Sequence, residues 1–362
     1  MGLIFVAALA PAIRLMPGYC AKAAGSAGFI SPLLALPLLI AYTLLLSSFM
    51  KRRRTQEGLG ELILRTNGRA AGGVILGTAA LFLVYCCGFI LRSGAARFIS
   101  TVYPDAPPLP FEAAMLVIGT VAALGPYNAL LRSARLFLPV LVTVLVLVPV
   151  FSLKSIDADL LLPVLPSDIG GMALGAVPML DVFAGMLCYS AILRAGSPLS
   201  ADRPGNYVLP IILSGLLFSL LSLCCIGTYG APLVTRFSHP FFTLIRNLTL
   251  FRSIEHVEAI VVTLWVLPDF AVFTLMLSAA ARILRLLFGF VPERGSVPLL
   301  KMTNGRGLIL ACAALAGIAS LTAELIPGGV KLLSELIIPL ANMSVCLVLI
   351  PVAYIICIIR ER

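Results

Sequence analysis

The sequence predicts an all-α, polytopic membrane protein with about ten transmembrane helices, arranged as two inverted halves of five. Three observations lead to this fold class. The chain of 362 residues is 60% hydrophobic and only 12% charged, whereas soluble proteins are about 45–50% apolar and about 25% charged. Apolar runs long enough to cross a bilayer recur along the whole chain. Glycine and proline interrupt the first and the sixth of these runs, which occupy matching positions in the two halves.

The candidate spans follow one another through linkers that contain glycine, proline or charge. The ten spans cover about 2–21, 28–50, 72–99, 111–130, 134–153, 170–193, 206–229, 256–288, 307–326 and 333–358. One linker is the charged segment 51–69, and another is the short segment 131–135 between the fourth and fifth spans. Because no polar-patterned stretch of domain length, about 50 residues or more, occurs, residues 1–362 are expected to form a single integral membrane domain.

The distribution of basic residues predicts the orientation of the chain in the membrane. With both termini in the cytoplasm, the inner segments hold 17 of the 26 lysines and arginines. Short cytoplasmic loops of membrane proteins carry such an excess of positive charge. The formal net charge of +10 is therefore assigned to topology and to the lipid bilayer as a partner, and not to nucleic acid.

The sequence contains no pattern typical of an enzyme or of a metal site. A Ser/His/Asp set, a P-loop and a GxGxxG after a strand are all absent. The nine cysteines lie mostly inside apolar runs without the CxxC spacing of zinc sites, and the two histidines have no spacing relation. We therefore expect no catalytic residues, no metal and no cofactor, and we expect the cysteines to act as small packing residues.

The first and sixth spans each contain a predicted break. The first carries Ala10-Pro11-Ala12 and then Pro17-Gly18, and the sixth carries Gly170-Gly171, Gly175, Pro178 and Gly185. Interrupted helices at matching positions of two halves indicate an inverted-repeat transporter whose substrate site lies at the break. Backbone groups freed there cannot remain unpaired in lipid, so they line a cavity or bind a ligand.

Ionisable residues inside the spans are the next candidates, because a charge in the membrane is costly and usually meets a partner or a cavity. Asp181 lies near the break in the sixth span, and Asp269 lies midway along the eighth. One hypothesis is that either aspartate binds a substrate ammonium or carries a proton, while Arg14 or Arg92 binds a carboxylate. The alternative is an Asp–Arg pair that only locks helices together. Arg97 is expected to extend to the membrane interface.

The segment 240–252 is predicted to be an amphipathic helix on the outer membrane surface. Its apolar residues, Phe241, Leu244, Leu248 and Phe251 among them, recur at helical spacing, and polar residues fill much of the other side. Pro240 suits the first helical position, where an N–H would have no partner. The eighth span begins shortly after this segment.

The same region carries a resemblance to a known family. LIRN at 244–247, IEHVEAI at 254–260 and LW at 264–265 resemble the B-subunit family of bacterial spore germinant receptors, which belongs to the amino acid–polyamine–cation transporter superfamily. The resemblance extends over nearly the whole chain. In two places the chain departs from the family: His256 replaces an arginine, which makes one basic site pH-dependent, and Ala10-Pro11-Ala12 replaces a glycine-rich break.

The resemblance implies a subunit that binds a small germinant, most often an amino acid, in the inner membrane of a spore. Binding would be relayed to an A subunit and a lipoprotein C subunit. It also implies a pocket between spans one, three, six and eight. The expected lining residues are Ala10, Pro11, Ala12, Cys86, Phe89, Asp181, Phe183, Gly185, Thr274 and Ser278. Residues expected to serve structure or partner contacts are Arg246, Glu255, Glu258 and Trp265.

Two other functions are compatible with the same residues. A proton- or cation-coupled amino acid permease would share the fold and the pocket but would turn over its substrate. A non-binding scaffold subunit would retain the helices with a vestigial pocket, and the departure at Ala10-Pro11-Ala12 favours it. The sequence does not name the germinant or the coupling ion.

Overall fold

The computed structural model of the chain describes residues 2–54, 57–102, 106–195, 204–237, 239–247, 261, 263–289, 298–322 and 337–360. The secondary structure within these ranges is helical, which confirms the predicted all-α class. The α-helices are α1 (Gly2–Ala24), α2 (Ser31–Met50), α3 (Leu59–Val102), α4 (Leu109–Leu124), α5 (Tyr127–Ser152), α6 (Ile169–Gly175), α7 (Val177–Ile192), α8 (Gly205–Tyr229), α9 (Ala231–Val234), α10 (Pro240–Asn247), α12 (Val266–Leu287), α13 (Pro298–Thr322), α15 (Ile338–Met343) and α16 (Ile350–Arg360). Short 3₁₀ segments are η1 (Gly25–Ile30), η2 (Leu153–Ser155), η3 (Ala158–Leu161) and η4 (Pro166–Asp168), and a π-helical turn, η8 (Ser344–Leu349), joins α15 to α16.

The helices have the length and composition of membrane spans. Eight helical segments within the described residues are long and apolar enough to cross a bilayer. Two shorter apolar helices, Gly2–Ile13 and Leu109–Leu124, accompany them. The chain is therefore a multi-pass membrane protein.

One predicted linker is helical and a second is helical in part, which corrects the expected boundaries. The segment 131–135 lies inside α5, and the chain turns earlier because Gly125 and Pro126 adopt extended conformations after α4. In the segment 51–69, helix α3 already begins at Leu59 and bends at Gly68, whose φ of 79° favours glycine. The charged residues of these segments were interpreted as loops, but charged side chains are also tolerated on a helix face.

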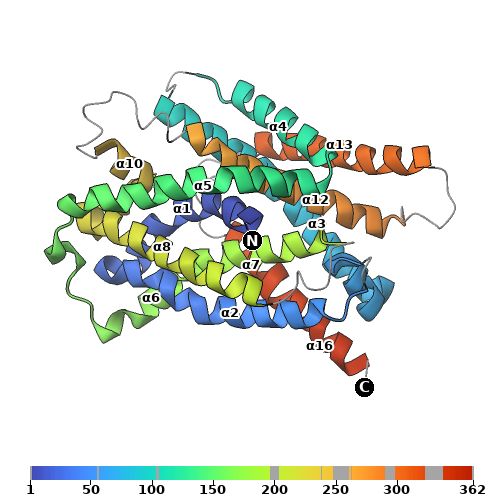
Figure 1. Ribbon diagram of the computed structural model, residues 1–362, viewed down its shortest axis with the longest axis horizontal. Coiled ribbons are helices and arrows are strands. Elements are labelled where there is room, and N and C mark those ends of the chain that lie inside the picture. The colour runs from blue at the N-terminus through green and yellow to red at the C-terminus, as the bar shows by residue number, and fades with distance from the viewer. Residues whose placement is uncertain are drawn as a thin grey trace.

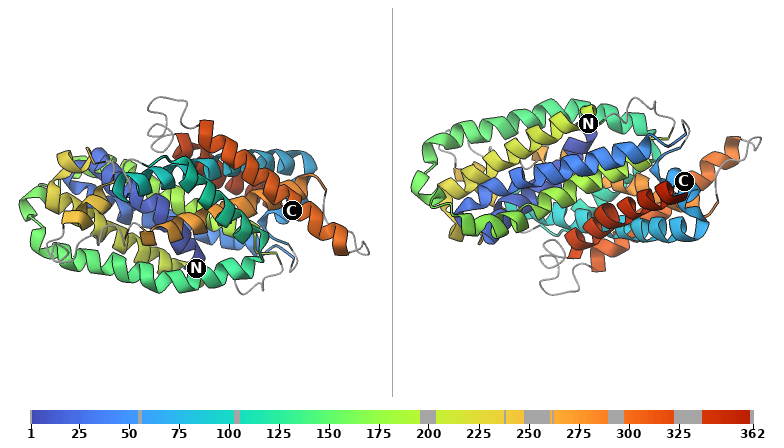
Figure 2. Two further views of the ribbon diagram at one scale, coloured as in Figure 1. Left: turned by 90° about the horizontal axis from the view of Figure 1, so that it is seen from above. Right: turned by 90° about the horizontal axis from the view of Figure 1, so that it is seen from below.

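Helix α1 is the centre of the bundle. It contacts α5, α6, α7, α8 and α12, and its side chains from Val6 to Leu9 are fully buried. Figure 1 shows the long helices side by side, with α4 and α13 along one edge and α2 along the other. In Figure 2, the view from below shows α2 and α8 on the same face, where the two helices are in contact.

Small residues allow close helix contacts between α3 and its neighbours. A Cβ atom on Gly88 would lie 2.6 Å from the Ala316 carbonyl oxygen of α13. On the side of α12, the Cys87 thiol donates to the Phe273 carbonyl at 3.9 Å. Membrane helices associate through such van der Waals contacts because lipid offers no hydrophobic driving force between them.

The two predicted breaks have different outcomes. Helix α1 is continuous across Ala10-Pro11-Ala12, so no interruption occurs there. A helical proline removes one hydrogen-bond donor and has a φ that a helix accepts, and neighbouring helices can stabilise the resulting bend. The sixth span is kinked but not interrupted: Ala176 separates α6 from α7, yet its backbone is helical, its N–H donates to the Met172 carbonyl and its carbonyl accepts from the Leu180 N–H. A Cβ on Gly175 would lie 2.4 Å from Ser31 Oγ, so the kink is pressed against the start of α2.

Helix α10 is amphipathic, but its apolar face packs on protein rather than on a membrane surface. Phe241, Phe242, Leu244 and Ile245 are buried, and the helix contacts α1 and α8. The rings of Phe241 and Phe242 lie 5.3 and 5.7 Å from that of Trp265. The expected remainder of this helix, residues 248–252, lies outside the described residues.

Candidate functional site

The candidate site begins with a stripe of three residues on α7. Asp181, Gly185 and Tyr189 are spaced four residues apart, so they lie on one face of the helix. Helix α7 has no lipid-facing side, because every residue from Pro178 to Ile192 is buried. It packs against α1, α2, α12 and α15. The stripe is therefore enclosed by protein, about one turn beyond the kink at Ala176.

Asn342 of α15 makes hydrogen bonds along this stripe. Its amide nitrogen donates to the Asp181 carbonyl oxygen at 2.8 Å and to Asp181 Oδ1 at 2.6 Å. The Tyr189 hydroxyl donates to Asn342 Oδ1. Asp181 and Asn342 are each only 4% exposed. An asparagine amide has two N–H donors and an oxygen acceptor, so both ends of this side chain have partners.

Gly185 allows this contact. A Cβ atom there would lie 2.7 Å from Asn342 Nδ2, too close for any other residue without displacing the asparagine. The Cys346 thiol lies at the other end of the amide, 3.5 Å from Asn342 Oδ1. Gly185 was expected to give room to a ligand; in this structure Asn342 occupies that room.

Three other intramembrane charges, Arg92, Arg97 and Asp269, form ion pairs between helices. Arg97 of α3 pairs with Asp269 of α12, and the two residues are 3% and 5% exposed. Arg92 Nη1 lies 2.9 Å from Glu112 Oε1 of α4. The expectation that Arg97 reaches the membrane interface is wrong, because its guanidinium is held by Asp269 and lies 5.9 Å from the ring centre of Phe242.

The expected pocket residues of α3 and α7 have different surroundings. Phe183 stacks edge-on against Phe218 of α8 at 6.1 Å, two residues from Asp181 and so on a different face of α7. Cys86 is buried. Phe89 is also buried and packs against Tyr85 and Ile338.

The expected pocket residues of α1 and α12 belong to two helices that are in contact. Ala10 and Ala12 are buried, and Pro11 is half-buried. Thr274 is buried, and its hydroxyl has no hydrogen-bond partner among the described residues. Ser278, one turn further along α12, is half-buried. A free hydroxyl in the core is available to a bound ligand or water.

The predicted partner-facing residues are only partly described. Trp265 is fully buried and Arg246 is exposed. Glu255, Glu258 and His256 lie outside the described residues. The backbone of Arg14 belongs to α1, and its side chain is outside the description.

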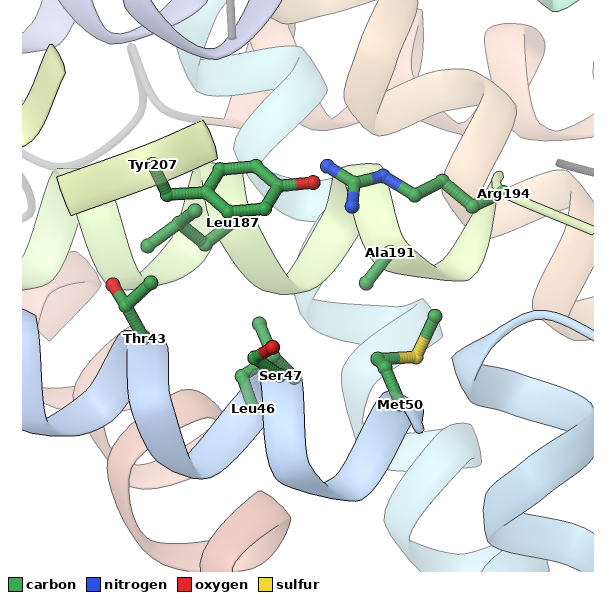
Figure 3. Close-up of a pocket in the computed structure, with 8 residues that line it drawn as sticks. All are labelled: Thr43, Leu46, Ser47, Met50, Leu187, Ala191, Arg194 and Tyr207. Atoms are coloured by element: carbon green, nitrogen blue, oxygen red, sulfur yellow. The ribbon is translucent and has the colours of Figure 1, made fainter. Parts of the chain in front are cut away.

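A separate cavity lies between α2, α7 and α8, at the end of the bundle where α2 ends and α8 begins. It is a small pocket that is partly open to the surroundings. Its lining residues are Thr43, Leu46, Ser47, Met50, Leu187, Ala191, Arg194 and Tyr207. Figure 3 shows the Arg194 guanidinium and the Tyr207 hydroxyl pointing toward one another across it. The guanidinium carbon lies 4.9 Å from the Tyr207 ring centre.

A family profile described as "Spore germination protein" matches residues 1–304. The chain belongs to this spore germination family. No curated protein sequence matches it. The match confirms the resemblance drawn from the segment 244–265 and extends well beyond it.

Solved structures show which fold this spore germination protein shares. It resembles MhsT in complex with L-phenylalanine, with a TM-score of 0.61 and 16% identity, over 100% of this chain and 98% of that one. It also resembles a Na⁺-coupled sialic acid symporter in a substrate-bound, outward-open state, with a TM-score of 0.60 and 9% identity, over 96% and 84% of the two chains. At these identities the likeness establishes the fold, which is that of transporters.

Within the spore germination protein, the candidate site offers hydrogen-bonding chemistry. Among the described residues no cluster of three His, Cys, Asp or Glu side chains could hold a metal ion. A buried carboxylate beside a helix kink is an acceptor for a cationic or hydrogen-bond-donating ligand.

The sequence predicted Asp181 and Gly185 as site residues but did not predict Tyr189, Asn342 or Glu112. Two patterns could have indicated such residues: the four-residue spacing of Asp181, Gly185 and Tyr189, and the lone asparagine in the last apolar run.

Proposed function

We propose that this chain is the membrane subunit of a nutrient germinant receptor. It binds a small germinant, most simply an amino acid, in the spore inner membrane, and both of its termini lie in the cytoplasm. Binding is passed on to the A and C subunits of the receptor and triggers germination. The proposal includes ten spans in two inverted halves, with the ligand at the kink between α6 and α7.

The single observation that carries this proposal is the buried Asp181 carboxylate just beyond that kink. An amino acid presents an ammonium group, and a charge-assisted hydrogen bond to a buried carboxylate contributes about 1.5–3 kcal/mol. Asp181 lies in α7, which contacts α1 and α12. The free Thr274 hydroxyl of α12 supplies a second polar group for the ligand.

A receptor must convert this binding into a change of conformation. A ligand shifts an equilibrium between two conformers only if it binds one of them more tightly. The hydrogen bonds from Asn342 to Asp181 link α7 to α15, so a ligand on Asp181 acts on both helices. That linkage favours a sensing role.

Equilibrium binding of a panel of the natural amino acids to the purified protein tests the proposal. Asp181→Asn should weaken the tightest-binding amino acid by about tenfold or more, which corresponds to at least about 1.4 kcal/mol. Asp159→Asn makes the same chemical change at an exposed position and serves as the matched control. An unchanged affinity in a normally accumulating Asp181→Asn protein would place the ligand elsewhere.

A permease is the second candidate, favoured by the likeness to two transporters over nearly the full chain. Uptake of a radiolabelled amino acid into proteoliposomes distinguishes the two functions, because a sensor binds without accumulating substrate.

A third candidate, the non-binding scaffold, is favoured by the continuous α1 and by Asn342 filling the space beside Gly185. Absence of binding for every amino acid tested would support it.

A further inference from the structure

Two oxygens of Asp181 accept from one NH₂ group. The Asn342 amide nitrogen lies 2.8 Å from the Asp181 carbonyl oxygen and 2.6 Å from Asp181 Oδ1. A backbone carbonyl combined with a carboxylate oxygen is also the acceptor pair that suits a primary ammonium, which donates up to three hydrogen bonds. The Asn342 amide therefore occupies the position and uses the acceptors that the ammonium of an amino acid would need.

The surrounding residues hold the amide in this position. Gly185 has no side chain where Asn342 approaches α7, and the Tyr189 hydroxyl donates to Asn342 Oδ1. Cys346 lies 3.5 Å from the same oxygen. Each of these features makes it easier for Asn342 to remain on Asp181, and none of them requires a bound ligand.

We propose that Asn342 is a positioning residue that competes with the ammonium of the ligand for the oxygens of Asp181. The ligand binds by displacing the amide, so Asn342 sets both the germinant concentration required and the preference for a primary ammonium. This inference rests on the proposed function, because it concerns the same site.

Displacement of Asn342 moves the segment that carries it. Asn342 lies at the end of α15, directly before the π-helical turn Ser344–Leu349. A single π-turn within an α-helix holds one extra residue in its hydrogen-bonded ring and is often found at functional sites. Release of the amide leaves this turn free to change its hydrogen-bond register, which would rotate α15 relative to α16. The binding event is then transmitted along the last helical segment.

Two substitutions test the competition. Asn342→Ala removes the competing amide, and the amino acid that binds the wild-type protein most tightly should then bind about tenfold more tightly, because two hydrogen bonds to Asp181 no longer have to be broken. Tyr189→Phe releases one end of the amide and should shift the affinity in the same direction by a smaller factor. Thr143→Ala, which removes a hydroxyl from an exposed position of α5, should leave it unchanged.

The measurement is equilibrium binding to each purified protein, with size-exclusion chromatography as the check of folding. The 2-hydroxy acid of the same side chain, which has a hydroxyl in place of the ammonium, is the matched probe and should gain much less in Asn342→Ala. A merely structural role predicts the opposite sign, weaker binding in both variants. If Asn342→Ala does not accumulate, Tyr189→Phe decides by its direction.

The possible outcomes separate this inference from the function on which it rests. Wild-type binding without tightening in either folded variant overturns the competition and leaves the receptor function standing. Absence of binding by the wild type and by both variants overturns both. Binding by Asn342→Ala alone supports the competition strongly, since the amide would then close the site completely.

Discussion

Breaking the ion pair between Arg97 and Asp269 should strongly destabilise the bundle, while removing both charges should not. Both side chains are nearly inaccessible, at 4% and 7% exposure. Loss of one partner from a buried pair leaves an uncompensated charge and costs about 3–5 kcal/mol. Arg97→Met should cost about 0.5–2 kcal/mol more, because it also removes the cation–π contact with Phe242. Asp269→Leu removes the carboxylate that Arg97 contacts on α12 and belongs in the same range.

The double variant Arg97→Met, Asp269→Leu replaces the pair with apolar groups of similar volume, which is often neutral or stabilising. We therefore expect its free energy of unfolding to lie within about 1–2 kcal/mol of the wild type. The difference from the sum of the single variants is a coupling energy of about 3 kcal/mol or more, expected for residues in direct contact. A double variant as unstable as that sum would refute the reasoning.

Equilibrium unfolding in mixed micelles of detergent and sodium dodecyl sulfate measures these free energies. The chain has one tryptophan, Trp265, which is buried and lies beside Phe242. Its fluorescence reports this region, and far-UV circular dichroism reports the whole bundle. Agreement between the two probes establishes that the transition is cooperative.

Three further predictions follow from packing and topology. Phe241→Asp should sharply lower accumulation in the membrane, because it buries an unpaired charge, whereas Thr243→Asp on the half-buried side of α10 should be tolerated; equal losses would argue against a one-sided helix. Gly88→Ala should destabilise the protein by about 1–3 kcal/mol through overpacking, because its Cβ would meet a backbone carbonyl of α13 at 2.6 Å, while Gly73→Ala, with 3.9 Å to its nearest neighbour, should be neutral. A cysteine replacing the exposed Arg54 on a cysteine-free background should react with an impermeant maleimide only after permeabilisation; labelling of intact cells would reverse the proposed orientation.

Hydrophobic length and the family resemblance predicted the fold because both depend on patterns within the sequence. Within the described residues, eight helical segments have the length and composition of a membrane span. The segment 131–135 was misassigned to a linker because its arginines resemble a loop, although α5 carries them on its surface. Gly125-Pro126 was the stronger turn signal, since proline restricts the residue before it and glycine ends helices readily.

The partners of the buried polar residues could not be predicted from the sequence. Asp181 and Asn342 are 161 residues apart, and no local pattern specifies such a contact. Arg97 illustrates the same limit, because a long basic side chain near a helix end can reach either solvent or a buried acid. Which of these occurs depends on the packing of α12 against α3, and that is a property of the fold.

The complete burial of α7 has a consequence for how its sequence can vary. A helix at the rim of a bundle, such as α5, alternates between exposed residues like Leu136, Val140 and Val150 and buried ones like Leu141 and Leu145. In a saturation mutagenesis screen, tolerance to substitution along α5 should rise and fall with the helical period. Along α7, from Pro178 to Ile192, the same screen should show uniformly low tolerance without any period. The helix that carries the aspartate should thus tolerate fewer substitutions than α5.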